Sequence, residues 1–236
     1  MSEERHLLER AFGYPYAVPA FSYLYEDGVT APPGEADFAG RVPVLAYGSN
    51  AAPDQLVRKF GDVPGTSIPV TRASVRGVDV VYAALFAQYG SVPATIHASE
   101  GTEAFVHVTW LTGDQLERMH GTEGAGTAYR YGSLPGDAVE FRDSPDAGEV
   151  FVYVAAAGAL GPEPVALASV PAKRRRYADA GQPEMLRAVR DRLAPGADLD
   201  SFVIGTVRDA GLRARRGAAL ARDALPPSVP GFTPLS

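Results

Sequence analysis

Short β-type segments alternate with short helical ones from residue 42 onward, and this alternation is the strongest constraint on the fold. Strand candidates lie at 42–47, 67–76, 78–87, 93–97, 104–110, 128–133, 138–142 and 149–156. Helical patterns lie among and after them, at 51–60, from 112 to the glycine at 121, and at 183–193. Such irregular interleaving favours an α+β fold over a doubly wound parallel sheet.

The two ends of the chain differ from this central part. Residues 2–12 have a short helical pattern, whereas residues 13–40 are rich in Pro and Gly, which predicts an irregular arm. The aromatic residues of the arm indicate that it packs on the rest of the protein. A further helical stretch lies at 212–224, before a Pro-rich end. We therefore expect an N-terminal arm, a central domain and a C-terminal helical and Pro-rich tail, at 1–41, 42–194 and 195–236.

The composition excludes several classes of chemistry. The chain has no Cys, which rules out a thiol nucleophile and a thiolate metal site, and its four His are too far apart for a zinc-binding helix. We therefore expect no metal site. A net charge of −6 argues against nucleic acid as a partner, and the Arg-rich clusters at 173–176 and 213–216 are predicted to be solvated surface. The apolar runs are too short for a membrane span, so we expect a cytoplasmic protein that does not bind membranes. As to oligomeric state, we expect a monomer or a homodimer.

The segment Tyr47-Gly48-Ser49-Asn50 separates a strand candidate from a helix candidate. A chain that leaves a strand at Gly and enters a helix directs unpaired backbone N–H groups outward. Together with the helix dipole, these groups can bind a carboxylate or a phosphate. The alternative is an ordinary turn in which Ser49 or Asn50 only caps the helix, since Gly-Ser-Asn is common in turns.

Glu123 lies between glycines at the end of a predicted helix. A carboxylate at such a position can project into a cleft, and one that is partly removed from water can act as a general base. A solvated loop carboxylate is the alternative. His120 is spaced either to orient Glu123 or to cover the helix end. Tyr129 and Tyr153 can orient a substrate through their phenols or fill a strand face.

Taken together, these segments resemble the γ-glutamylcyclotransferase-like family. Members carry a Tyr-Gly-Ser-Asn loop after the first core strand, an Ala-Thr-Ile segment, a Trp-bearing strand that leads to a helix ending in Glu-Gly, a Tyr strand, a Ser-Tyr-Leu-like strand and a Gly-x-Pro before a helix. The similar segments here occur in the same order, at 47–50, 94–96, 106–110, 123–124, 129–131, 152–154 and 181–183. The resemblance covers residues 42–194 and leaves out the arm and the tail.

The resemblance implies a small mixed β-barrel surrounded by helices. It also implies a reaction in which the α-amine of a γ-glutamyl amine, amino acid or peptide attacks its own γ-carbonyl, releasing 5-oxoproline and the free amine. It assigns the role of general acid and base to Glu123 and implies that no metal or organic cofactor is needed. It assigns substrate binding to Tyr47, Gly48, Ser49, Asn50, Tyr129 and Tyr153.

The sequence departs from the family pattern at two places near the expected site. Ala51-Ala52 follows the loop where many relatives have a larger apolar residue, and Met119-His-Gly-Thr replaces the usual approach to the Glu. We expect these departures to affect which substrate is bound more than they affect the fold. A non-catalytic binding module on the same fold and an amide hydrolase that releases glutamate are the alternative functions.

Overall fold

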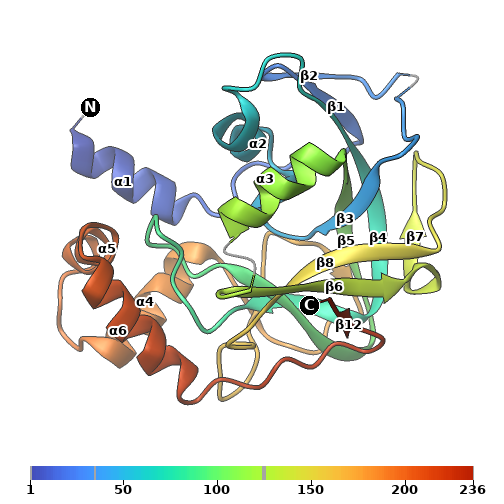
Figure 1. The fold of residues 1–236 in the computed structure, drawn as a ribbon. Helices are drawn as coiled ribbons and strands as arrows, with labels where there is room; N and C mark the ends of the chain where they lie inside the picture. Colours follow the sequence, from blue (N-terminus) through green and yellow to red (C-terminus); the bar gives the residue numbers. More distant parts are fainter. Residues whose placement is uncertain (1, 35, 124–125, 236) are drawn as a thin grey trace.

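A long antiparallel hairpin forms the centre of the fold in the computed structural model, which describes residues 2–34, 36–123 and 126–235. Its strands are β4 (Ser67–Tyr82) and β5 (Ala94–Leu111) (Figure 1). The sequence predicts each of them as two shorter strands. In the structure each is continuous, because the chain passes through a register shift between Arg76 and Val78 instead of turning back.

Strand β3 (Val42–Ala46) lies inside the sheet, between two partners. It pairs antiparallel with β5 and parallel with β8 (Glu149–Ala155), whose other neighbour is β6 (Tyr129–Pro135). The side chains at 43–46 are buried. Because β3 is held on both edges, the loop that follows it has a fixed starting point.

The expected α+β class is confirmed, but the sheet does not close into the expected small mixed β-barrel. Within the described residues twelve strands join in one sheet. Eight of them follow the order β11 (Asp179–Ala180), β9 (Ala166–Leu167), β4, β5, β3, β8, β6 and β12 (Thr233–Pro234), and the two end strands do not pair with each other. The edge of β6 is occupied by a C-terminal strand, so β6 does not close the sheet. The other four strands pair beside this path: β1 (Tyr23–Glu26), β2 (Val29–Ala31), β7 (Val139–Phe141) and β10 (Ala172–Lys173).

The segment expected to be an irregular arm contains a regular hairpin. Strands β1 and β2 pair antiparallel around Asp27 and Gly28, which both have positive φ. Asp-Gly is the preferred pair for such a tight turn, and this signal outweighs the Pro and Gly content of the segment as a whole. β1 continues the sheet beside β4, and the side chains of Tyr23 and Tyr25 are fully buried.

Six α-helices occur in the described part of the chain: α1 (Glu3–Phe12), α2 (Pro53–Phe60), α3 (Gly113–Glu123), α4 (Gln182–Leu193), α5 (Leu199–Arg208) and α6 (Ala210–Ala221). Figure 1 shows α1 beside α5, on the side of the molecule that also holds α4 and α6. Helix α5, whose N-cap is Asp198, was not expected from the sequence. No helix among these residues combines the length and the apolar character needed to cross a membrane.

The Arg-rich cluster at 173–176 is not uniformly solvated, contrary to expectation. The Arg175 side chain is 14% exposed, and it contacts Asp79, whose side chain is fully buried. Arg175 Nε and Nη2 donate to the Asp79 carboxylate at 3.0 and 3.2 Å. Arg176, the next residue, is 59% exposed. The cluster therefore combines a structural guanidinium with solvated ones.

Candidate active site

The loop at 47–50 leaves the sheet at the C-terminal end of β3 and passes close to the N-terminal segment. A Cβ atom at Gly48 would lie 2.6 Å from the Tyr14 hydroxyl oxygen, so a side chain at this position would collide with a buried group. Tyr14 Oη also accepts the Ala94 backbone N–H at 2.8 Å. The loop, β5 and the N-terminal segment are thus packed together at this point.

Neither Ser49 nor Asn50 caps helix α2, which excludes the ordinary capping role considered from the sequence. A short 3₁₀ turn covers Ser49–Ala51, and the N-cap of α2 is Ala52, with Pro53 in the first turn. The Asn50 side chain instead points to the end of α3. Its Nδ2 donates to Glu123 Oε1 at 3.2 Å, and its Oδ1 is buried with no partner in the described residues.

Glu123 is the last residue of α3, and its carboxylate forms an ion pair with Lys59 from the last turn of α2. The Lys59 side chain is 5% exposed and the Glu123 side chain 18%. Lys59 Nζ also lies 3.0 Å from Met119 Sδ. Removing two charges from water costs several kcal/mol, and close pairing is what offsets that cost.

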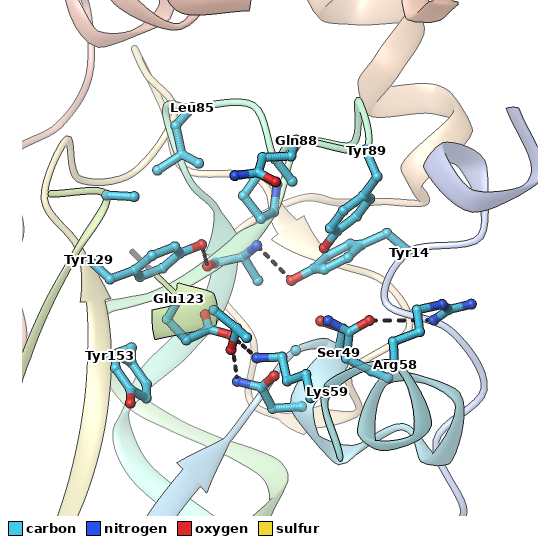
Figure 2. A pocket seen from close by; sticks show the side chains of 18 of the residues that line it. Tyr14, Ser49, Arg58, Lys59, Leu85, Gln88, Tyr89, Glu123, Tyr129 and Tyr153 are labelled. Atoms are coloured by element: carbon cyan, nitrogen blue, oxygen red, sulfur yellow. Dashed lines mark hydrogen bonds and ion pairs between the residues drawn. The ribbon is translucent and has the colours of Figure 1, made fainter. Parts of the chain in front are cut away.

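The loop and the ion pair line a cavity of about 730 Å³, a size typical of small-molecule sites. Figure 2 shows Tyr129 and Tyr153 on one side of Glu123 and Arg58 on the other. Tyr14 and Tyr89 lie above Lys59 in this view. All seven residues assigned from the resemblance line this one cavity: Tyr47, Gly48, Ser49, Asn50, Glu123, Tyr129 and Tyr153. Gly124, the second residue of the expected Glu-Gly motif, lies outside the described residues.

The tyrosines of the cavity are held as neutral phenols. Burial raises the pKa of Tyr14 and Tyr129 well above the usual value, and burial followed by the negative charge of Glu123 raises the pKa of Tyr47 and Tyr153. Tyr129 donates to the Ala94 carbonyl at 3.0 Å, and Tyr47 donates to the Tyr153 carbonyl. These bonds fix the phenols as parts of a rigid wall.

His120 does not orient Glu123, which was one of its two expected roles. Its Nδ1 instead lies 2.8 Å from the Tyr153 hydroxyl, and its ring stands edge-on to Tyr131 at a centroid distance of 4.5 Å. Tyr153 therefore presents its ring to the cavity while its hydroxyl is engaged with α3.

No family model and no curated protein matches the chain. Two solved structures are similar to part of it. One is the solution structure of an Arabidopsis thaliana protein, with 21% identity and a TM-score of 0.38 over 51% of this chain and 72% of that one. The other is a gamma-glutamyl cyclotransferase, with 15% identity and a TM-score of 0.40 over 49% of this chain and 66% of that one. This degree of similarity assigns neither a family nor a reaction.

Sequence reasoning missed several residues of the cavity wall: Arg10, Tyr14, Arg58, Lys59 and Tyr89. A signal was available for Lys59, because it follows Leu56 by three positions and precedes Phe60, and both of these are buried. Its place on the apolar face of a helix predicts a buried cation that needs an anionic partner. No comparable signal exists for Arg10 and Tyr14, since their place depends on how the N-terminal segment folds back over the loop.

Proposed function

We propose that this chain is a cyclotransferase that converts a γ-glutamyl amine, amino acid or peptide into 5-oxoproline and the free amine. One observation supports this above others. The two most specific elements of the family resemblance, the 47–50 loop and Glu123, line one cavity and are joined by the 3.2 Å hydrogen bond from Asn50 to Glu123, although 73 positions separate them in the sequence.

The proposed reaction needs a base that removes a proton from the substrate's α-ammonium group. The bonds from Asn50 and Lys59 both fall on Glu123 Oε1, and among the described residues no bond falls on Oε2. We assign the proton transfer to Oε2. The freed amine then attacks the γ-carbonyl carbon and forms the ring C–N bond. The bond to the leaving nitrogen breaks, and Glu123 returns a proton to that nitrogen.

Negative charge develops on the γ-carbonyl oxygen during the attack, and the loop is suited to oppose it. The 3₁₀ turn begins with the bond from Ala51 N–H to Gly48 O, and the N–H groups of Gly48 and Ser49 precede it. Tyr14 Oη already accepts the Ala94 N–H, so its own proton is available as a further donor. Fixed donors at a dry site stabilise such charge far better than water does.

Most of the rate enhancement in this account comes from holding the substrate bent. An amine kept close to its own carbonyl reacts with a very large effective concentration. The rigid wall formed by Tyr47, Tyr129 and Tyr153 would fix the glutamyl part, while the reacting groups face Glu123 and the loop. The nucleophile belongs to the substrate, so the protein needs to supply only a base, donors and shape.

The test is to incubate the protein with a panel of γ-glutamyl amines, amino acids and peptides, following 5-oxoproline, glutamate and the free amine. Formation of 5-oxoproline with an equal amount of amine supports the proposal. Release of glutamate instead would show an amide hydrolase. Binding without turnover across the panel would show a binding module, and either result would overturn the cyclotransferase assignment.

A further inference from the structure

The cavity extends beyond the reacting groups, toward the N-terminal helix. Arg10 from α1 and Arg58 from α2 both line it, together with Tyr89. Arg58 lies on the opposite side of Glu123 from Tyr129 and Tyr153 (Figure 2). A γ-glutamyl group that reacts at Glu123 against the tyrosine wall would therefore direct its leaving amine toward the two guanidinium groups.

Both guanidinium groups are available to a ligand. Neither Arg10 nor Arg58 takes part in any ion pair among residues 2–34, 36–123 and 126–235. Arg58 has one weak bond to a neutral acceptor, Gln55 Oε1 at 3.4 Å. Arg10 is half-buried, and its Nε is buried without a partner in the same part of the chain. An unpaired buried donor is costly and indicates a site that a ligand completes.

The rings of Tyr16 and Tyr89 hold the arginines in place. The Arg10 Cζ lies 4.9 Å from the centre of the Tyr89 ring, and the Arg58 Cζ lies 4.4 Å from the centre of the Tyr16 ring. The two rings are 6.3 Å apart. An aromatic ring against one face of a guanidinium leaves its N–H edges free for bidentate contact with a carboxylate.

The backbone at Tyr16 is strained in a way that favours this arrangement. Tyr16 has φ of 70°, a left-handed conformation that is unusual and strained for an aromatic residue. Its hydroxyl donates to the Arg10 carbonyl at 3.3 Å. The strained position brings the Tyr16 ring between Arg58 and Tyr89, which ties the N-terminal segment to α2.

Charge balance indicates the ligand. The ionisable lining consists of Arg10, Arg58, Lys59 and Glu123 besides the tyrosines, and the last two neutralise each other. Two positive charges remain. A γ-glutamyl alkylamine carries no net charge, whereas a γ-glutamyl amino acid carries one extra carboxylate on its leaving part.

We propose that Arg10 and Arg58 bind a carboxylate on the leaving amine, so that the substrate is a γ-glutamyl amino acid or peptide and not a γ-glutamyl alkylamine. This inference rests on the proposed cyclotransferase function. It gives the N-terminal segment, which lies outside the family resemblance, a part in substrate selection.

The test compares γ-glutamyl-alanine with γ-glutamyl-ethylamine, which differ by the carboxylate alone. We expect kcat/KM of the wild-type protein to be on the order of 10-fold to 100-fold higher for the alanine compound, as for the loss of a charge-assisted hydrogen bond. In Arg10→Gln and in Arg58→Gln the ratio of the two kcat/KM values should fall toward one. The matched control is Arg5→Gln on the same helix, where Arg5 is paired with Glu9 at the surface, and the ratio should stay at the wild-type value.

A binding measurement distinguishes failure of this inference from failure of the proposed reaction. Calorimetric titration of the Glu123→Gln protein with the two compounds reports the carboxylate contact without turnover. Tighter binding of γ-glutamyl-alanine, reduced by Arg10→Gln in the same background, supports the inference even if no 5-oxoproline forms. Equal affinities and equal kcat/KM values for the two compounds in the wild-type protein overturn it, as does an equal effect of the Arg variants on both compounds.

Discussion

Lys59 and Glu123 form an ion pair that joins the last turn of α2 to the last residue of α3, at the floor of the cavity. Lys59 is almost fully buried, and the pair accounts for the position of both side chains. The proposed catalytic carboxylate of Glu123 therefore also has a structural role, because the ion pair that holds α3 against α2 also orients this carboxylate.

Replacing Lys59 by Met should destabilise the protein by about 2–4 kcal/mol, because it leaves the Glu123 carboxylate largely buried and unpaired. The free energy of unfolding in urea measures this effect. The double variant Lys59→Met/Glu123→Leu should recover most of the loss, since both charges are then absent. Arg76→Met is the control, because Arg76 and its partner Glu140 are 64% and 42% exposed and their ion pair should contribute little. Equal effects of Lys59→Met and Arg76→Met would contradict a buried pair.

Gly48→Ala should cost about 1–3 kcal/mol, because the new Cβ would lie 2.6 Å from the Tyr14 hydroxyl oxygen. In a Tyr14→Phe background the same substitution should cost less, since the colliding oxygen is gone. A double-mutant cycle measured by urea unfolding detects this coupling. Gly217→Ala in α6 is the control, because a Cβ there has no neighbour within 4 Å and should be neutral or stabilising. Additive costs at positions 48 and 14 would show that the two residues do not touch.

Arg175→Gln should cost about 3–5 kcal/mol, since it leaves the fully buried Asp79 carboxylate without its cation. Thermal and urea unfolding both measure the change. The neighbouring Arg176→Gln removes an exposed guanidinium 3.8 Å from Glu100 and should have little effect. A small effect at both positions would mean that Asp79 is not held by Arg175.

His107 should make the protein less stable as the pH falls. Burial, followed by the nearby positive charge of Arg72, lowers the pKa of His107 from 6.5 to about 4 in the folded protein. Between these values the unfolded chain binds a proton that the folded protein does not, so the free energy of unfolding decreases with falling pH. The decrease from about pH 7 to about pH 4.5 should be smaller in His107→Gln, measured against both proteins at about pH 8, where the imidazole is neutral in both states. Equal pH dependence in the two proteins would contradict the assignment.

The elements that the sequence predicted correctly have strong local signals. The helices at 53–60 and 182–193 each have Pro in the first turn and an apolar face, and the strand at 149–155 is rich in Val and aromatics. The hairpin around Asp27-Gly28 was missed, although its signal was also local. The open sheet was not predictable, because it depends on β12 pairing with β6, across about a hundred residues of chain.

The residues of the site fall into the same two groups, those with a signal in the sequence and those placed only by tertiary packing. The convergence of the 47–50 loop with Glu123 was expected from the order of the family motifs, and the structure brings both to one cavity. Lys59 was recognisable on the buried face of its helix but was not singled out. Arg10 and Tyr14 reach the cavity only through the packing of the N-terminal segment on the loop, which no local pattern encodes.

The most direct test of the central claim is the rate of 5-oxoproline formation from γ-glutamyl-alanine by the wild-type protein and by Glu123→Gln. We expect the wild-type protein to form 5-oxoproline and alanine in equal amounts. The Glu123→Gln protein, with its fold verified by circular dichroism, should lose at least about 100-fold in kcat, the usual contribution of a general base. Formation of 5-oxoproline at the same rate by both proteins, or no formation above the uncatalysed rate by the wild-type protein, would contradict it.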